Sequence, residues 1–593
     1  MKRLITESAL EKFLLLFYCT GSLVFLGVFY NNHLYQKEQL QLFETTFQYL
    51  VQKISHQGGL ADYISEFFIQ FFHLPFMGAF VITVAFFLMQ RMFKKILQIT
   101  VGKPPTILFC FLPALGYWIL LLNDFYCLSG EVGLLLALLA TLIYLNVRNT
   151  RVKSFIGIFL LFIVYWFTGG AYILYAVIIL ISELIFRLDK REKQNNISLL
   201  FLLLFFLLAI LLPLVVRGFI IKDTVFQSYI SESYYKIRIF FPLPLILIFS
   251  SFPLFILIQN FIPDQVSEKQ LNAINALSVA VLFTLTIWGV IHNGDFKAES
   301  QIAYDNLVYK EEWGKIIKRA EKEQPSDQIS LVAINLALAK EGDLSSKMFM
   351  FHQTKSSLFI DYKRRGMTPF ITGEPYYYLG LFNFAQMFAM ETLESTPDTR
   401  FPSRSFRRIA ETYIINGQYD IALKYLTPLS HTLFYRKWAK ECISLLNNEE
   451  RINSHPYWGY MRGLRLKYDF YYDPGKNDIA LSFLLVSNPE NKTVFEYLMA
   501  YYLLQKDFDG FLAGLPYAER LNYNKLPLVW QEAAAYIETR VQQVPVQLMK
   551  YSISNDIIAN IRAYAEQFSS NKQDTMKIQK EFGNTYWYYL HFR

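Results

Sequence analysis

The sequence is poor in charge and in cysteine. Charged residues make up 18% of its 593 residues, against roughly 25% in typical soluble domains. Of the four cysteines, only Cys442 lies in the second half of the chain, which excludes a disulfide framework there. No Cys/His pair has zinc-site spacing, and no phosphate loop ending in Gly-Lys-Ser/Thr occurs. A disulfide-rich domain, a structural zinc domain and a P-loop nucleotidase are therefore excluded.

Long apolar runs are abundant instead, and they are concentrated in the first half. Hydrophobic residues make up 53% of the sequence, and nearly all the long runs lie before His292. From Asn293 onward, charged and aromatic residues recur with the period of amphipathic helices. We therefore predict an all-α protein with two domains. Residues 1–292 form a polytopic transmembrane helix bundle, and residues 293–593 form a soluble helical domain.

About nine segments of the first half are apolar enough to cross a bilayer, whose core of ~30 Å needs roughly 20 residues of helix. Gly169 and Gly170 interrupt the longest apolar stretch, and adjacent glycines permit a tight turn between two spans. The predicted spans cover residues 13–30, 74–93, 106–123, 130–147, 153–168, 171–187, 197–216, 241–259 and 274–291.

The loops predict the orientation of these spans. Basic residues gather in the loops on the N-terminal side, which the positive-inside rule places in the cytoplasm. The first apolar run lacks small residues for signal cleavage, so we expect it to stay as a transmembrane helix. With nine spans, the helical domain lies outside the cytoplasm, and in a Gram-negative host it is periplasmic beside the inner membrane. The same loops explain the net charge of +8, and no nucleic-acid partner is predicted.

The second half contains paired helices with the small-residue spacing of tetratricopeptide repeats. In residues 406–426, Ala410 and Ala422 permit close helix packing, and Gly417 permits the turn between the helices. We predict a solenoid of such hairpins, with a concave surface suited to binding a protein partner. The alternative is that the helical array only packs on its own membrane half.

Three stretches resemble a family of uncharacterised bacterial membrane proteins with tetratricopeptide-like tails. They are residues 58–75 (GGLADYISEFFIQFFHLP), residues 488–491 (NPEN) and residues 495–502 (FEYLMAYY). The resemblance covers the whole chain and implies no particular activity.

The layout of residues 1–291 is also loosely similar to that of the GT-C glycosyltransferases, with a long first outer loop followed by many spans. This similarity implies a catalytic or metal-binding acidic residue in the first outer loop, with a divalent metal as a possible cofactor. The chain lacks the Asp-x-Asp pair in that loop and the Trp-Trp-Asp motif in its tail.

One predicted helix in the first outer loop, residues 60–73, carries the main candidate site. Asp62, Glu66, Gln70 and His73 share one face, opposite a row of aromatic and aliphatic residues. Asp62, Glu66 and His73 are the candidate catalytic groups, because such groups on one face can hold a divalent ion or move protons. The alternative is the solvated face of an interfacial helix.

Further polar residues stand at span ends. Arg217 and Lys222, after the seventh span, are candidates for binding a lipid phosphate, although Arg217 can equally extend to the membrane surface. Glu131 follows Ser129-Gly130 and is expected to complement a helix N-terminus. Glu183 precedes Arg187 by one helical turn, which predicts a local ion pair.

Three functions fit this sequence. The first is an integral inner-membrane protein of the cell envelope whose helical domain binds a protein partner. The second is a membrane-embedded glycosyltransferase that uses a polyprenyl-phosphate-linked sugar. The third is a transporter with a helix broken at Gly169 and Gly170.

The predicted topology can be tested with reporter fusions. A reporter that is active only outside the cytoplasm should be active when fused after Asn293 and silent after Lys103 or Lys193. Activity after Lys193 combined with silence after Asn293 would mean that the pair of spans around Gly169 has been counted wrongly.

Overall fold

The chain forms two compact units made of helices. The computed structural model describes residues 9–102, 105–123, 126–188, 196–220, 224–230, 243–259, 268–361, 368–396, 401–468, 476–570 and 575–593, and these residues contain no β-strand. Unit 1 extends to Glu299 and includes His431–Arg436 from the second half. Unit 2 comprises Ser300–Thr396, Phe401–Ser430 and Lys437–Arg593.

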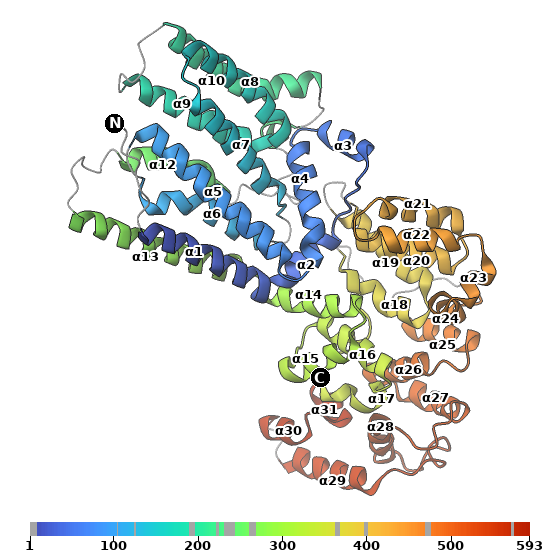
Figure 1. Cartoon of the computed structure of the whole chain (residues 1–593). Helices are drawn as coiled ribbons and strands as arrows, with labels where there is room; N and C mark the ends of the chain where they lie inside the picture. The colour runs from blue at the N-terminus through green and yellow to red at the C-terminus, as the bar shows by residue number, and fades with distance from the viewer. Residues whose placement is uncertain are drawn as a thin grey trace. The chain divides into compact units, whose positions relative to one another are not determined.

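Unit 1 contains the helices of the predicted membrane bundle (Figure 1). In chain order they are α1 Ala9–Val24 with η1 Phe25–Phe29, α2 Asn31–Gln39, α3 Phe47–Ile54, α4 Gly59–Ile69 with η2 Gln70–His73, α5 Met77–Val101, α6 Ile107–Leu121, α7 Ser129–Asn146, α8 Thr150–Thr168 with η3 Gly169–Ala171, α9 Tyr172–Leu188, α10 Asn196–Phe219, α11 Val225–Tyr229, α12 Leu243–Gln259 and α13 Glu268–Asn293.

The core of unit 1 is built around α6. Every side chain of α6 except that of Leu108 is buried, as expected for a helix that is apolar on all sides. Helices α5, α12 and α13 pack against it. On the periphery, α1 and α13 run side by side (Figure 1), and the rings of Phe17 and Phe283 lie 5.5 Å apart. Large apolar side chains on these peripheral helices are exposed, as a lipid-facing surface requires.

Five helical segments are long and apolar enough to cross a membrane: Ala9–Phe29, Ser129–Asn146, Thr150–Arg187, Leu199–Phe219 and Ala273–Asn293. The apolar helices α6 and α12 are shorter. Each of the nine predicted spans coincides with a helix of unit 1. That the chain crosses the membrane nine times stays a prediction.

The helix break predicted at Gly169 is present. Gly169 ends α8 with a positive φ of 59°, which glycine adopts without strain. Helices α8 and α9 are antiparallel, because Lys153 near the start of α8 forms an ion pair of 2.6 Å with Glu183 near the end of α9. The prediction that Glu183 pairs with Arg187 is wrong, because the hairpin brings Lys153 of the neighbouring helix to Glu183.

Unit 2 is a succession of short helices, most of which pack on the helix before or after them. Helix α14 Phe296–Tyr309 enters unit 2 at Ser300. The elements that follow are α15 Trp313–Glu323, α16 Gln328–Glu341, α17 Leu344–Lys347, η5 Met348–Met350, η6 Phe370–Gly373, α18 Glu374–Leu379, α19 Phe382–Ser395, α20 Ser403–Ile415, α21 Tyr419–Ser430, α22 Arg436–Leu445, α23 Glu449–Ser454, α24 Pro456–Leu464, α25 Asn477–Ser487, α26 Lys492–Gln505, α27 Phe508–Arg520, α28 Leu528–Glu538, α29 Asn555–Ser570, α30 Thr575–Phe582 and α31 Tyr586–Phe592.

The hairpin expected at residues 406–426 is formed by α20 and α21. Ala410 and Ala422 are fully buried, and Gly417 in the turn has a φ of 75°. Small side chains therefore allow close helix contact at this hairpin, as the sequence pattern indicated. That the whole unit is a tetratricopeptide-like solenoid stays a prediction.

A buried network of charges joins α14, α18 and α20. Arg404 donates from Nη1 and Nη2 to the two carboxylate oxygens of Asp305, each at 2.8 Å, and from Nη2 to Glu374 at 3.0 Å. Arg408 donates to Glu374 and to Glu411, both at 2.6 Å. Burial acts to raise the pKa of Glu374, but Arg408 and Arg404 outweigh it and hold that pKa below its ordinary value. Each buried charge therefore has an opposite charge in contact.

Replacing Arg404 by Met should destabilise unit 2 by about 3–5 kcal/mol, because Asp305 and Glu374 would keep their burial and lose this cation. Pulse proteolysis of the full-length protein in urea measures the change. Arg319→Met is the control, since Arg319 pairs with Glu323 at 3.0 Å in a far more exposed position and should cost at most about 1 kcal/mol. Equal losses in the two variants would contradict the role given to the network.

Candidate functional site

The predicted polar stripe lies on α4 and η2 of unit 1. Helix α4 begins after Gly58, and its regular turns end at Ile69, where the chain tightens into the 3₁₀ turn η2. Asp62 and His73 are half-buried, and Glu66 is buried. The stripe is therefore not the solvated face of an interfacial helix along its whole length.

Glu66 is closed off by α3. Its Oε1 accepts from Lys53 Nζ at 2.8 Å, and its Oε2 accepts from the Tyr49 hydroxyl at 2.5 Å. Its side chain is 1% exposed, against 24% for Lys53. A buried carboxylate with a cation and a hydroxyl on its two oxygens is a satisfied structural ion pair.

His73 has different neighbours. Its Nδ1 lies 2.9 Å from the carbonyl oxygen of Gln70, and its ring lies 4.1 Å from that of Phe434. Gln70 accepts from the backbone N–H of Leu433 at 3.4 Å. The structure thus separates the candidate residues, with Glu66 facing α3 and His73 facing the segment His431–Arg436. The described residues contain no group of three or more His, Cys, Asp or Glu side chains able to hold a metal ion.

The segment His431–Arg436 was not expected from the sequence to belong to the membrane unit. Tyr435 donates its hydroxyl to Glu38 at 3.1 Å. Burial raises the pKa of Glu38 to about 8, although this hydrogen bond lowers it. Burial therefore favours the neutral form of the Glu38 carboxyl at this contact.

Of the two residues predicted to bind a lipid phosphate, Arg217 lies among the described residues. Arg217 lies exposed in the last turn of α10. Lys222 lies outside the described residues. Of these two residues, the structure therefore describes the surroundings of Arg217 alone.

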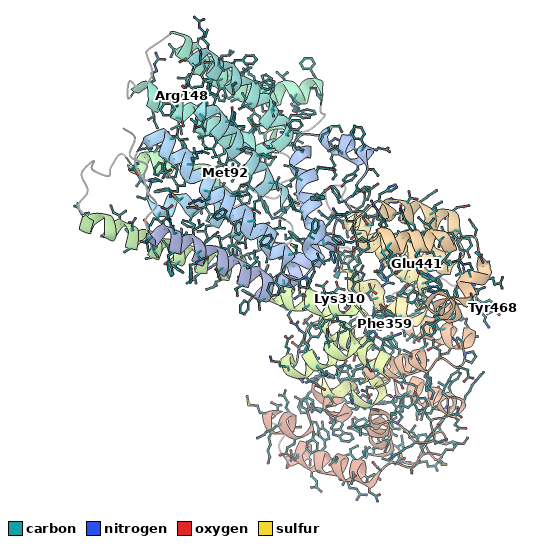
Figure 2. All side chains as sticks on the ribbon, in the orientation of Figure 1. Met92, Arg148, Lys310, Phe359, Glu441 and Tyr468 are labelled. Atoms are coloured by element: carbon teal, nitrogen blue, oxygen red, sulfur yellow. The ribbon has the colours of Figure 1, made fainter. Side chains whose placement is uncertain are left out.

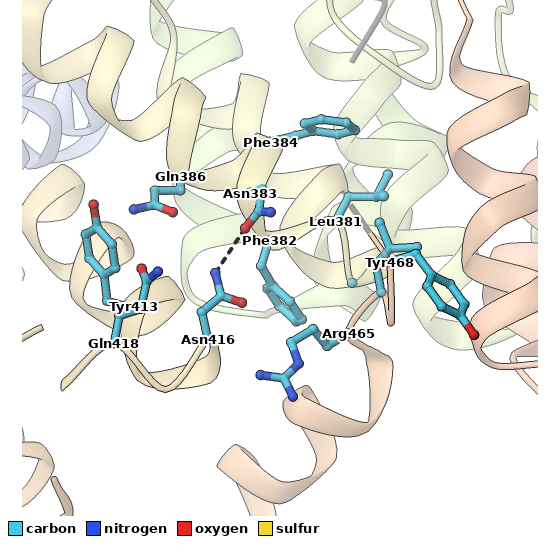
Figure 3. Close-up of a pocket in the computed structure, with 12 residues that line it drawn as sticks. Leu381, Phe382, Asn383, Phe384, Gln386, Tyr413, Asn416, Gln418, Arg465 and Tyr468 are labelled. Atoms are coloured by element: carbon cyan, nitrogen blue, oxygen red, sulfur yellow. Dashed lines mark hydrogen bonds between the residues drawn. The ribbon is translucent and has the colours of Figure 1, made fainter. Parts of the chain in front are cut away.

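A groove of ligand size lies among the described residues of unit 2. Its volume is about 390 Å³, within the range of roughly 300–1,000 Å³ usual for ligand sites. The close-up in Figure 3 shows side chains from α19, from the α20 to α21 turn and from the segment after α24. The lining residues are Gly380, Leu381, Phe382, Asn383, Phe384, Gln386, Tyr413, Asn416, Gln418, Arg465, Leu466 and Tyr468.

The shape of the groove depends on Gly380. This residue ends α18 with a φ of 104°, a conformation that side chains disfavour. A Cβ atom at this position would lie 2.4 Å from the carbonyl oxygen of Leu464. Only glycine therefore lets the chain turn here against the end of α24.

Amide groups dominate the chemistry of the groove. Asn416 donates to Asn383 at 3.0 Å (Figure 3). Arg465 donates from Nη1 to the Ile415 carbonyl at 3.1 Å. These contacts leave Asn383 with its NH₂ group and Arg465 with its remaining N–H groups available to a ligand. Tyr468 is 69% exposed and extends from the surface (Figure 2). Little in the sequence indicated this groove, because Asn416 and Gln418 flank Gly417 and resemble ordinary turn residues.

These features define an all-helical membrane protein with a second, groove-bearing helical unit. The chain belongs to DUF6057, a family of unknown function, which matches residues 7–593. No functionally curated protein and no solved structure shows significant similarity to it.

Replacing Lys53 by Met should destabilise unit 1 by about 2–3 kcal/mol, because Glu66 would stay buried beside Tyr49 without its cation. The thermal stability of the full-length protein in detergent measures this loss. Adding Glu66→Gln should restore part of it, since the amide oxygen still accepts from Tyr49 and carries no charge. Unchanged stability in Lys53→Met would mean that Glu66 does not depend on this ion pair.

Proposed function

We propose that this protein is an integral membrane protein of the bacterial cell envelope that binds a protein partner through its helical unit. The groove beside α19 and the α20 to α21 turn carries the proposal. This groove combines a ligand-sized volume with available hydrogen-bonding groups. Unit 1 then serves as the membrane platform.

A polypeptide segment fits the chemistry of the groove. The backbone of an extended peptide offers alternating N–H donors and C=O acceptors, and amide side chains can pair with both. The side-chain amides of Gln386 and Gln418 make no hydrogen bond to another described residue, so these groups are available for such pairing. Arg465 adds a donor for a carboxylate of the partner. The aromatic rings of Tyr413 and Tyr468 offer flat contact area to its side chains.

The proposed orientation follows from the basic residues of the loops. An N-terminus in the cytoplasm and nine spans place unit 2 outside the cytoplasm, on the periplasmic side of the inner membrane in a Gram-negative host. The partner is then another envelope protein. A nucleic acid does not match the groove, because Arg465 is the single cation among its lining residues.

The glycosyltransferase alternative receives less support from the described residues. A transferase needs a carboxylate that faces its lipid-linked substrate, whereas Glu66 is enclosed by Lys53 and Tyr49. Asp62 and His73 do not join it around a common cavity. We therefore propose no second function.

Photo-crosslinking in intact cells tests the proposal. A photoreactive residue at Gln418 or Tyr468 should crosslink the full-length protein to one defined protein. The same residue at Tyr460, which is 56% exposed and does not line the groove, should not. Equal crosslinking at all three positions would contradict binding in the groove.

Removing polar groups from the groove should weaken that crosslink. Combining Asn383→Ala with Arg465→Ala removes two binding groups worth about 1 kcal/mol or more each, so affinity should fall roughly tenfold or more. Arg319→Ala, which changes a half-buried arginine elsewhere in unit 2, is the matched control. An unchanged crosslink in the double variant would show that these side chains do not contact the partner.

A further inference from the structure

Glu131 differs from the other buried carboxyl groups of unit 1. It lies in the first turn of α7 and is fully buried, and neither of its carboxyl oxygens accepts a hydrogen bond from another described residue. By contrast, Glu11 pairs with Lys94 at 2.6 Å, Glu66 with Lys53 at 2.8 Å and Glu183 with Lys153 at 2.6 Å. Complementing the N-terminus of α7, as the sequence suggested, would not explain why this carboxyl is enclosed.

An ionised carboxyl without a partner is costly in such a position. Removing a charge from water costs several kcal/mol, and a group with no opposite charge in contact avoids this cost by taking up a proton. Glu131 is therefore expected to be stable in this bundle as a neutral acid. Its ionised form requires a compensating change nearby.

The electrostatic surroundings of Glu131 include a tyrosine of α1. Tyr18 of α1 is close enough for an electrostatic interaction with it. The Tyr18 hydroxyl and the Trp118 indole N–H are buried and make no hydrogen bond to another described residue, and the two rings lie 5.1 Å apart. Both residues line a cavity of about 60 Å³, which is large enough for water. Tyr18, which interacts electrostatically with Glu131, thus lines a small cavity together with Trp118.

The charged groups on the helices packed around α7 lie far from Glu131 or interact with other residues. Lys153 of α8 and Glu183 of α9 lie at the Tyr144 end of α7, about 20 Å along the helix from Glu131. The cations of α5, Arg91, Lys94 and Lys95, lie in the half of that helix leading to Thr100, which bonds Ser182 at the same end. On α4, Glu66 is paired with Lys53, and Asp62 is half-buried. The tyrosines of α8 and α9, Tyr165, Tyr172 and Tyr175, donate to backbone carbonyls.

The end of α7 that carries Glu131 is next to a polar part of unit 1. Lys37 donates from Nζ to the carbonyl oxygens of Asn123 and Tyr126, each at 2.9 Å, just before α7 begins. Tyr117 donates its hydroxyl to the Gly130 carbonyl at 2.9 Å. Hydrogen-bonded polar groups of unit 1 therefore lie beside the end of α7 that carries Glu131.

We propose that Glu131 is an intramembrane proton-binding site, with Tyr18 as the neighbouring hydroxyl. On uptake, a proton delivered by water forms an O–H bond with one carboxylate oxygen, and on release the proton returns to water. This site lies in unit 1 and is independent of the groove in unit 2. It gives the membrane unit a chemical activity besides anchoring.

A carbodiimide tests the site in the full-length protein. Dicyclohexylcarbodiimide adds to protonated carboxyl groups in apolar surroundings and leaves a stable adduct that peptide mass spectrometry can locate. With the protein in lipid vesicles between about pH 5 and about pH 9, Glu131 should be labelled at low pH. Labelling should fall roughly tenfold per pH unit once the pH exceeds the pKa of the group. Glu183, which is ion-paired with Lys153, is the internal control and should stay unlabelled.

Two results would overturn the proposal. Equal labelling of Glu131 at every pH would show a permanently neutral, structural carboxyl, and no labelling at any pH would show that it does not hold a proton. Tyr18→Phe keeps the ring against Trp118 and removes the hydroxyl, so it should move the midpoint of the labelling profile. An unchanged midpoint would show that the Tyr18 hydroxyl does not interact with the proton-binding carboxyl. Because the measurement is made on the wild-type carboxyl, its outcome does not depend on whether a Glu131 variant folds.

Discussion

The rule that a charge removed from water needs a partner governs both units. In unit 2, Arg404 and Arg408 hold three buried carboxylates and so fix the mutual positions of α14, α18 and α20. In unit 1, Lys153 and Glu183 hold the ends of the α8 and α9 hairpin together. These contacts are specific in a way that apolar packing is not, because sliding one helix past another would leave a charge alone in an apolar interior. The same rule draws attention to Glu131, which has no such partner.

Local features of the fold could be predicted from the sequence. The break at Gly169 and the hairpin with buried Ala410 and Ala422 depend on residues that are close in the chain. Glycines in turns and small residues at helix contacts act over one or two helical turns, so periodicity reveals them. The helical character of the described residues could be predicted in the same way.

Contacts between distant segments could not be predicted in this way. Glu183 was expected to pair with Arg187 on its own helix, yet its cation comes from Lys153 across the hairpin. The spacing of Asp62, Glu66 and His73 predicted that they share one face of a helix. Spacing does not reveal which side chains pack on that face. Lys53 and Phe434 occupy the surroundings of Glu66 and His73. The groove was missed for the same reason, since Asn383, Asn416 and Arg465 come from three separate parts of the chain.

The segment His431–Arg436 also affects how the protein is made. Phe434 and Tyr435 contact His73 and Glu38, which lie between η1 and α5. A ribosome produces α1 to α13 long before it reaches these residues, so the helices of the membrane unit can insert while part of its packing is still missing. Until residue 436 has been synthesised, Glu38 lacks the Tyr435 hydroxyl and the ring of His73 lacks its aromatic neighbour. The unit that begins first along the chain is therefore completed only after much of the second has been translated.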